Sequence, residues 1–170
     1  MKLLLQYLSL CFFINNPADL HPTKSLMWKT VVFYIVSGCI VEGLISDPAD
    51  GSLEVFLRTI MAFSTVATLL LVTKKWHYYN QMFIAIFVCE NLIMTLGTAT
   101  EGLYHALVMN HHDAAEEISI ALGIFLVIWY ISIVSYIFRQ MLLFHMGSSV
   151  VLAISYFILT YGVPMLFMDI

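Results

Sequence analysis

Charged residues are scarce in this sequence. Of its 170 residues, 11% are charged and 61% are hydrophobic, whereas an ordinary soluble domain is about 25% charged and about 45–50% apolar. The apolar residues come in long blocks rather than in the short alternating runs of a half-exposed sheet. The composition therefore excludes a water-soluble globular domain and predicts a protein whose main solvent is lipid.

Basic clusters and cysteine pairs are also lacking. The formal net charge is -4, and the 7 Lys and Arg residues form no long run that would suit nucleic acid, which is therefore not an expected partner. The three cysteines, Cys11, Cys39 and Cys89, are odd in number and lie inside apolar stretches. This pattern indicates small buried residues rather than a disulfide framework or a metal site.

Recognisable catalytic motifs are missing too. The sequence contains no H-E-x-x-H, no Gly-rich phosphate loop and no Ser/His/Asp array. All 6 histidines fall in loops or at span ends, so they are not placed to face one another as haem ligands. We therefore expect no cofactor and a protein that is not an enzyme.

Five long apolar segments are present, each close to the about 20 residues that a helix needs to cross the hydrocarbon core. Turn residues or charges such as Asp47-Pro48 and Lys74-Lys75 separate them. Because an unpaired strand cannot satisfy its backbone in lipid, all five are predicted to be helices. The expected fold is an all-α integral membrane protein, a single domain over residues 1–170 with about five transmembrane helices. The predicted spans are 27–45, 55–73, 79–96, 118–138 and 146–168.

The first 14 residues are apolar but too few to span a membrane, and they run into Asn15-Asn16-Pro17, where a helix would stop. A cleaved signal peptide is one interpretation, since Lys2 precedes an apolar core, but no small-x-small cleavage site follows. The favoured interpretation is an uncleaved helix over residues 1–14 that lies at the membrane interface or packs on the bundle.

Lysine and arginine divide unevenly between the two ends of the predicted spans. With the N-terminus inside, all the basic residues except Arg58 fall on the cytoplasmic side, and cytoplasmic loops are enriched in these residues. We therefore expect a multi-pass protein with a cytoplasmic N-terminus and a periplasmic C-terminus.

Two pairs of polar residues interrupt the apolar spans. Glu90 and Asn91 lie near the middle of the third span, where a carboxylate costs at least about 2.5 kcal/mol on insertion scales and is a functional candidate by default. Glu90 is either a proton or cation relay or a protonated side chain that hydrogen-bonds a Ser, Thr or Tyr of a neighbouring helix, and the second interpretation is favoured because few intramembrane polar groups accompany it. Glu42 and Arg58 lie near the outer ends of the first and second spans, where an antiparallel pair of helices brings them within reach of each other.

The longest external loop is rich in side chains that bind metals. It contains His105, His111, His112 and Glu116, which are residue types that zinc and copper sites use. The acids that precede the next apolar run also fit the start of a helix, where they complement its dipole. A metal site and a solvated loop with a helix cap are both open.

The segment Pro17–Met27 resembles the P-x-D-L-P-x-S stretch that precedes the first span in small Yip-like inner-membrane proteins of gammaproteobacteria, a family of unknown function. Gln81 and Ala85 fall where that family places a Gln-x-x-x-Ala, and Ile137–Arg139 falls where it places an Ile-x-Arg. Glu90-Asn91 and the His-rich loop depart from the family pattern. The resemblance implies a bacterial inner-membrane location and a helical bundle, and it assigns no catalytic residue.

The leading functional hypothesis is a non-enzymatic inner-membrane protein that serves as a structural or assembly subunit of a larger envelope complex. Its partners would be the lipid bilayer and other membrane proteins or further copies of itself, because five short-looped helices expose little soluble surface. The alternatives are a small proton- or cation-coupled transporter that uses Glu90, and metal binding by the His-rich loop. The sequence shows no inverted repeat and no clear Gly/Pro-broken helix, the features that mark a carrier's site.

Overall fold

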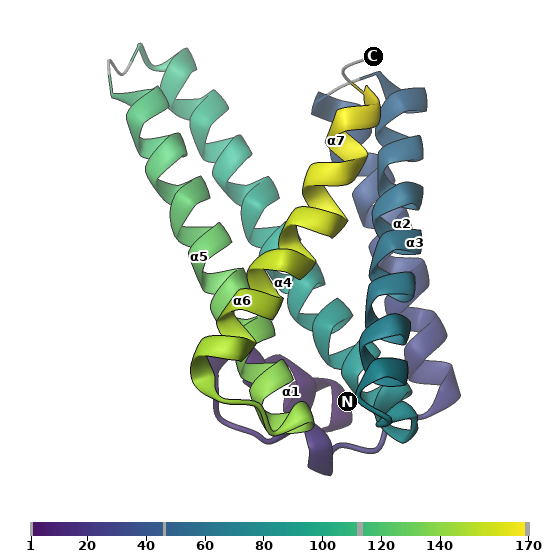
Figure 1. Ribbon diagram of the computed structural model, residues 1–170. Coiled ribbons are helices and arrows are strands. Elements are labelled where there is room, and N and C mark those ends of the chain that lie inside the picture. Colours follow the sequence, from purple (N-terminus) through teal and green to yellow (C-terminus); the bar gives the residue numbers. More distant parts are fainter. Residues whose placement is uncertain (1, 46, 112–113, 169–170) are drawn as a thin grey trace.

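The computed structural model describes residues 2–45, 47–111 and 114–168 (Figure 1). The elements are α1 (Lys2–Leu8), the 3-10 turns η1 (Ser9–Phe12) and η2 (Pro17–Asp19), α2 (Lys24–Ile45), α3 (Pro48–Val72), the 3-10 turn η3 (Trp76–Tyr78), α4 (Tyr79–Met109), α5 (Ala115–Leu142), α6 (Met146–Phe157), the π-helical turn η4 (Ile158–Gly162) and α7 (Val163–Met168). Among the described residues, 5 helical stretches are long and apolar enough to cross a membrane: α2, α3, α4, α5 and the continuous α6–η4–α7. The predicted all-α membrane bundle with a short N-terminal helix is confirmed.

Helices α3 and α4 extend beyond the predicted spans. Helix α3 begins at Pro48 rather than at residue 55 because Asp47 caps it: the Asp47 carboxylate accepts a 2.9 Å hydrogen bond from the Ala49 N–H, and proline suits the first helical position. Helix α4 continues past residue 96 to Met109, since good helix formers such as Ala, Leu, Glu and Met follow. Hydropathy marks where a helix leaves the membrane, and capping and propensity decide where it ends.

The five spans run between the same two ends of the molecule. Helices α2, α4 and α6 begin at the end where α3 and α5 finish and where α1 lies, at the bottom of Figure 1. Lys24, Lys74, Lys75 and Arg139 all belong to the helix ends and turns at this end. We call it the basic end, and the other the opposite end.

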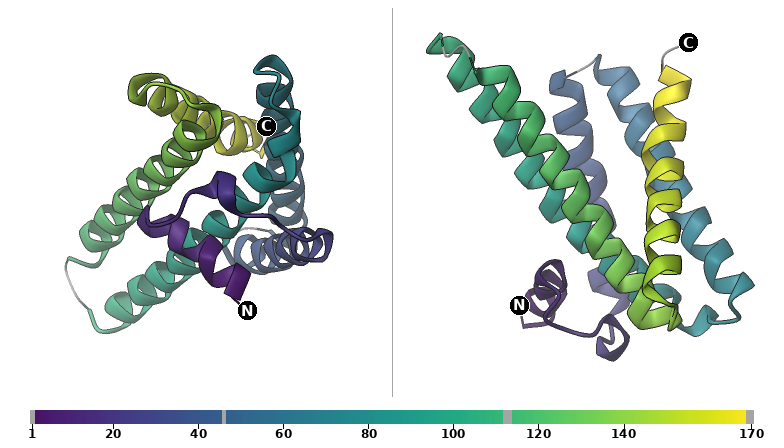
Figure 2. Two further views of the ribbon diagram at one scale, coloured as in Figure 1. Left: turned by 90° about the horizontal axis from the view of Figure 1, so that it is seen from below. Right: turned by 60° about the vertical axis from the view of Figure 1, so that its left-hand side comes forward.

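Helix α4 is the central helix of the bundle. It packs against α1, α2, α3 and α5, and 56% of its apolar window is buried, against 22–28% for the other spans. Toward the opposite end, the α4–α5 hairpin leans away from α2, α3 and α7, so that the ribbons form a V that closes at the basic end (Figures 1 and 2). The buried half of α4 therefore lies where all the spans converge.

The N-terminal segment packs on the basic end of α4 and α5. Tyr7 and Cys11 are fully buried. The indole N–H of Trp129 donates a 3.0 Å hydrogen bond to the Cys11 carbonyl, and the Tyr136 hydroxyl donates one of 3.0 Å to the Asn15 carbonyl. The helix expected over residues 1–14 thus consists of α1 and η1 and lies against the bundle.

The close approach of α2 and α3 depends on Gly51. A Cβ atom at this position would lie 2.8 Å from the Glu42 carbonyl carbon and 2.9 Å from the Glu42 Cβ, which is shorter than any tolerable carbon–carbon contact. Small residues let membrane helices approach in this way. Gly51 therefore sets where Glu42 stands relative to α3.

We predict that Gly51→Ala destabilises the protein. The added methyl group must push α2 away from α3, and overpacking of this kind costs typically about 1–3 kcal/mol. The matched control is Gly97→Ala, because a Cβ at Gly97 meets nothing within 4 Å and alanine favours a helix over glycine by about 1 kcal/mol. Thermal unfolding in a mild detergent should show a lower Tm for Gly51→Ala only, and an unchanged Tm for this variant would contradict the tight α2–α3 contact.

Candidate functional site

Glu90 lies inside the protein rather than against lipid. Every residue from Gln81 to Asn91 is buried, because the bundle surrounds this half of α4 on all sides. The Glu90 side chain is 3% exposed. A carboxyl group at this depth must find its polar partners on neighbouring helices.

Two tyrosines hold one oxygen of the Glu90 carboxyl group. The Tyr34 hydroxyl, from α2, donates a 3.0 Å hydrogen bond to Glu90 Oε1. The Tyr161 hydroxyl, from η4, donates one of 2.6 Å to the same atom. Both groups are donors here, so this arrangement stabilises an acceptor oxygen on Glu90.

The second oxygen of the carboxyl group is buried without a partner. Glu90 Oε2 and the hydroxyls of Tyr130 and Tyr156 make no hydrogen bond of normal geometry to any described residue, although the Tyr130 hydroxyl stands near both the Glu90 carboxyl group and the Tyr156 hydroxyl. Tyr130 on α5 and Tyr156 on α6 are both almost fully buried, at 2% and 1% exposure. Each buried polar group left unpaired costs about 1–3 kcal/mol. These three groups together therefore favour binding of a ligand that hydrogen-bonds to them or carries a positive charge.

A single arginine stands beside the tyrosines. Arg58 Nη1 is 2.7 Å from Glu42 Oε1, and Arg58 Nη2 pairs with Glu54 one turn earlier on α3. The guanidinium carbon lies 4.7 Å from the centre of the Tyr161 ring, a cation–π arrangement. The expected Glu42–Arg58 pair is present, and Glu54 is a second partner whose i,i+4 spacing was the available signal.

We use the name Glu90 cluster for the residues that meet around this carboxyl group. They are Tyr34, Arg58, Glu90, Tyr130, Tyr156 and Tyr161. All five spans contribute at least one of them. The sequence suggested a Ser, Thr or Tyr as the partner of Glu90 but did not single out these tyrosines, although a tyrosine in the middle of a span, away from the interface where this residue is common, was a usable signal.

The last span is interrupted where it meets the cluster. Residues Ile158–Gly162 form a π-helical turn. Pro164 has no N–H to donate to the Thr160 carbonyl, so the regular α-helical pattern cannot continue through this point, and Tyr161 lies within the widened turn. The expectation of uninterrupted spans is therefore wrong for this helix, and π-turns of this kind are frequent at functional sites.

A cavity of about 300 Å³ reaches the Glu90 cluster from the opposite end. It lies between the α4–α5 hairpin and the α2, α3 and η4 segments. Its polar lining includes Glu42, Arg58, Thr98, Glu101, Tyr130 and Tyr161. Thr98 and Glu101 are exposed, so the cavity connects the surface with Tyr161, whose hydroxyl donates to Glu90, and with Tyr130.

Asn91 turns toward different partners from its neighbour Glu90. Its side-chain amide donates a 3.3 Å hydrogen bond to the Thr30 carbonyl on α2, while its Oδ1 has no partner in the described part of the chain. Asn91 therefore ties α4 to α2 nearer the basic end. The adjacency of Glu90 and Asn91 in the sequence does not make them one site.

The histidine residues of the long loop are only partly described. His105 lies on α4, His111 follows the end of α4, and Glu116 lies in the first turn of α5, whereas His112 is outside the described residues. Within residues 2–45, 47–111 and 114–168, no group of three metal-ligating side chains is assembled. Metal binding by this loop stays a prediction.

Comparisons with protein families, with curated proteins and with solved structures found no match to this chain. The resemblance to Yip-like inner-membrane proteins therefore stays a prediction. The geometry of the Glu90 cluster is the basis for the functional argument that follows.

We predict that Arg58→Leu lowers the stability of the protein. Its removal breaks the ion pairs that the largely buried carboxylates of Glu54 and Glu42 make with Arg58, and breaking a buried pair costs about 3 kcal/mol. Arg139→Leu is the control, because Arg139 is exposed at the basic end. Thermal unfolding in detergent should show a large loss of Tm for Arg58→Leu alone.

The triple variant Arg58→Leu/Glu42→Gln/Glu54→Gln tests the electrostatic cause, since it removes the charge on all three side chains. It should recover part of the lost stability. If the Tm of the triple variant is lower than the Tm of Arg58→Leu, the packing of the arginine side chain rather than its charge stabilises this part of the bundle.

Proposed function

We propose that this protein is a small multi-pass membrane transporter in which Glu90 binds a proton or a small cation. The observation that carries the proposal is Glu90 Oε2, which is buried at the meeting point of five spans and, like the Tyr130 and Tyr156 hydroxyls, makes no hydrogen bond of normal geometry within the described part of the chain. A carboxyl group that only glued helices together would be expected to have both oxygens satisfied.

The charge around the site favours a positive guest. Glu42 and Glu54 already neutralise Arg58, so Glu90 and the Glu101 of the cavity are in excess over positive side chains. The Tyr130 and Tyr161 rings stand 6.0 Å apart at the cavity's deep end. Aromatic faces and carboxylates together are the groups that stabilise cations in a low-dielectric site.

The interrupted last span supports the same proposal. Transporters commonly place their site at irregular turns in spanning helices, where a short displacement changes the contacts of one side chain. Tyr161 in η4 touches both Glu90 and Arg58. A change in the charge of Glu90 would therefore act directly on η4 and on the ion pairs of α3.

A structural or assembly subunit of an envelope complex is the second candidate function. The observation in its favour is the half of the α4–α5 hairpin near the opposite end, which leans away from the other spans (Figure 2). Apolar side chains such as Val108, Ile124 and Phe125 are exposed there. Another membrane protein, a second copy of this chain or lipid alone would cover this surface.

We predict that Glu90→Gln abolishes transport while leaving the fold intact. Glutamine keeps an oxygen that accepts from Tyr34 and Tyr161, but it cannot take up or release a proton and carries no charge. The purified protein would be reconstituted in liposomes that contain a pH-sensitive dye, with a potassium diffusion potential as driving force. Wild type should accelerate the internal pH change, and Glu90→Gln should reduce the rate at least tenfold.

Glu117→Gln is the control, because Glu117 is an exposed acid at the start of α5. Repeating the assay with sodium, potassium or a bulky organic cation outside separates proton movement from movement of a cation. The transporter proposal is rejected if the rate of the internal pH change is the same for wild type, Glu90→Gln and empty liposomes with every cation. Stable co-purification of a membrane partner would then favour the assembly role.

We also propose a bacterial inner-membrane location in which the basic end faces the cytoplasm. The support is the accumulation of Lys and Arg at that end, together with loops far shorter than the about 60 residues beyond which charge stops deciding topology. Under this orientation the cavity that contains Glu101 opens to the periplasm.

We predict that impermeant thiol reagents label Asp50→Cys and Asn110→Cys on intact cells but not Trp76→Cys. All three positions are exposed in the structure, and they lie at opposite ends of the spans, so only the orientation distinguishes them. Labelling of Trp76→Cys from outside would reverse the orientation.

The native cysteines can stay in place for this experiment. Cys11 and Cys89 are fully buried and Cys39 lies within α2. Wild-type protein serves as the blank, and cells permeabilised before labelling show that Trp76→Cys is reactive when the reagent can reach it.

A further inference from the structure

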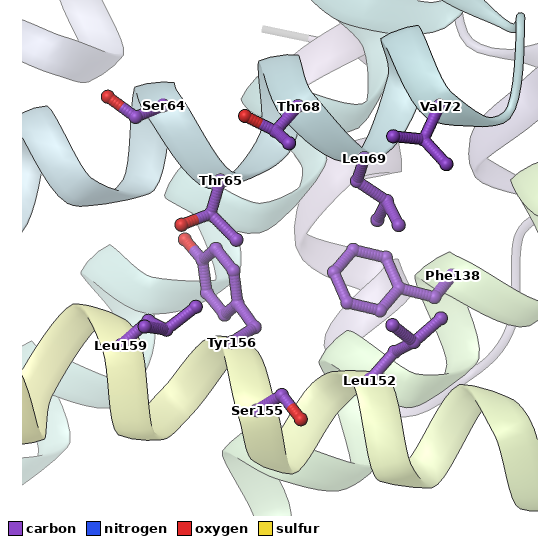
Figure 3. Close-up of a pocket in the computed structure, with 10 residues that line it drawn as sticks. All are labelled: Ser64, Thr65, Thr68, Leu69, Val72, Phe138, Leu152, Ser155, Tyr156 and Leu159. Carbon is purple, nitrogen blue, oxygen red and sulfur yellow. The ribbon is translucent and has the colours of Figure 1, made fainter.

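A second hollow lies on the other side of the Glu90 cluster, between α3 and α6. It has a volume of about 340 Å³ and occupies the half of the bundle near the basic end. Figure 3 shows the side chains that line it. The polar ones are Ser64, Thr65, Thr68, Ser155 and Tyr156, and we call this space the α3–α6 groove.

The hydroxyls of α3 that line the groove differ from those elsewhere on the same helix. Thr59 and Thr73 donate hydrogen bonds of 2.7 and 2.8 Å to the carbonyl one turn earlier, the usual way to satisfy a hydroxyl in a membrane helix. Ser64, Thr65 and Thr68 make no hydrogen bond to the part of the chain that the structure describes. This stretch of α3 therefore presents free donors and acceptors.

Tyr156 belongs to both the groove and the Glu90 cluster. Its side chain is 1% exposed, lines the groove and stands near the Tyr130 hydroxyl, which in turn stands near the Glu90 carboxyl group. Its hydroxyl has no partner among the described residues. In Figure 3 the Tyr156 hydroxyl and the Thr65 hydroxyl point toward the same space between the helices.

We propose that the α3–α6 groove is a hydrated passage through which Tyr156, Thr65 and Thr68 connect Glu90 with the basic end of the bundle. This inference rests on the proposed transport function and assigns the second half of its route. The cavity at the opposite end meets Tyr130 and Tyr161, and the groove meets Tyr156. Glu90 then lies between two separate access routes, one from each end of the bundle. A transport site that exchanges its ion with both sides of the membrane requires this arrangement.

Proton transfer along this passage balances at every step. The proton bound to Glu90 Oε2 passes to a water molecule of the passage, and that water passes a proton to the Tyr156 oxygen while the proton of the Tyr156 hydroxyl moves on to the next water or, through it, to the Thr65 oxygen. Each hydroxyl gains one proton and loses one, so none ends with a charge. If a metal cation is the guest, the same oxygens replace part of its hydration shell.

Water rather than a lipid chain is the occupant that fits the groove. Its mouth near the basic end is apolar, formed by Leu69, Val72 and Phe138. A lipid chain inside would leave the buried Tyr156 hydroxyl and the Thr65 hydroxyl unpaired, at about 1–3 kcal/mol each. Water satisfies both, because the two hydroxyls face the same space and the groove has room for more than one molecule.

Cysteine accessibility tests the hydration without relying on transport. Thr65→Cys and Thr68→Cys would be treated with a charged methanethiosulfonate reagent, which reacts only with thiols that water reaches, in inverted and in right-side-out membrane vesicles. The control is Leu71→Cys, because Leu71 is on the same helix nearer the basic end and is 62% exposed without lining the groove. If depth alone decided reactivity, Leu71→Cys would react fastest.

We expect Thr65→Cys and Thr68→Cys to react at least tenfold faster than Leu71→Cys, and only from the side that faces the basic end. Reaction no faster than that of Leu71→Cys would mean a groove filled by lipid and would overturn the inference. This measurement shows whether the groove contains water even if the wild-type protein transports nothing. It therefore distinguishes an error in the proposed hydration of the groove from an error in the proposed transport function.

The liposome assay gives the second measurement. Tyr156→Phe removes one hydroxyl with no change in ring packing and should slow transport about tenfold, whereas Tyr104→Phe, outside both hollows, should not. Unchanged transport by Tyr156→Phe, with Glu90→Gln still inactive, would reject the passage and leave Glu90 as the transport site.

Discussion

A carboxyl group inside a membrane can exist only where protein groups replace water, and this constraint organises the bundle. Glu90 receives hydrogen bonds from Tyr34 on α2 and Tyr161 on η4. The Tyr161 ring in turn lies under the guanidinium of Arg58, which pairs with Glu42 back on α2. Helices α2, α3, α4 and the last span are thus joined by one continuous polar network in a medium where apolar packing alone gives little preference for one arrangement over another.

Much of the architecture could be predicted from the sequence, because hydropathy and chain order determine it. Blocks of about 20 apolar residues predict spans, short connections make neighbouring spans antiparallel, and that geometry placed Arg58 beside Glu42, as the 2.7 Å contact confirms. The ends of the helices were less predictable. Pro48 and Asp47 start α3 well before the apolar block, since a cap is decided by a few atoms rather than by average hydropathy.

The cluster around Glu90 could not be predicted, because it depends on how each helix is rotated about its own axis. In a soluble helix the polar face fixes that rotation, but both faces of a membrane helix are apolar. Tyr34 and Tyr161 are 56 and 71 residues from Glu90, and no sequence spacing links them. The shortage of intramembrane polar groups that favoured a purely structural Glu90 was therefore only apparent, because the helix rotations bring several phenol hydroxyls toward this carboxyl group.

The attachment of the N-terminal segment has a consequence for biosynthesis. Its carbonyl groups at Cys11 and Asn15 accept hydrogen bonds from Trp129 and Tyr136, which lie 118 and 121 residues further along the chain. This segment leaves the ribosome before Trp129 and Tyr136 and therefore acquires these partners only after the fourth described span has entered the bilayer. Until then its buried face stays at the membrane surface or in contact with the insertion machinery. The N-terminal segment therefore packs into its final position only after most of the spans have been inserted.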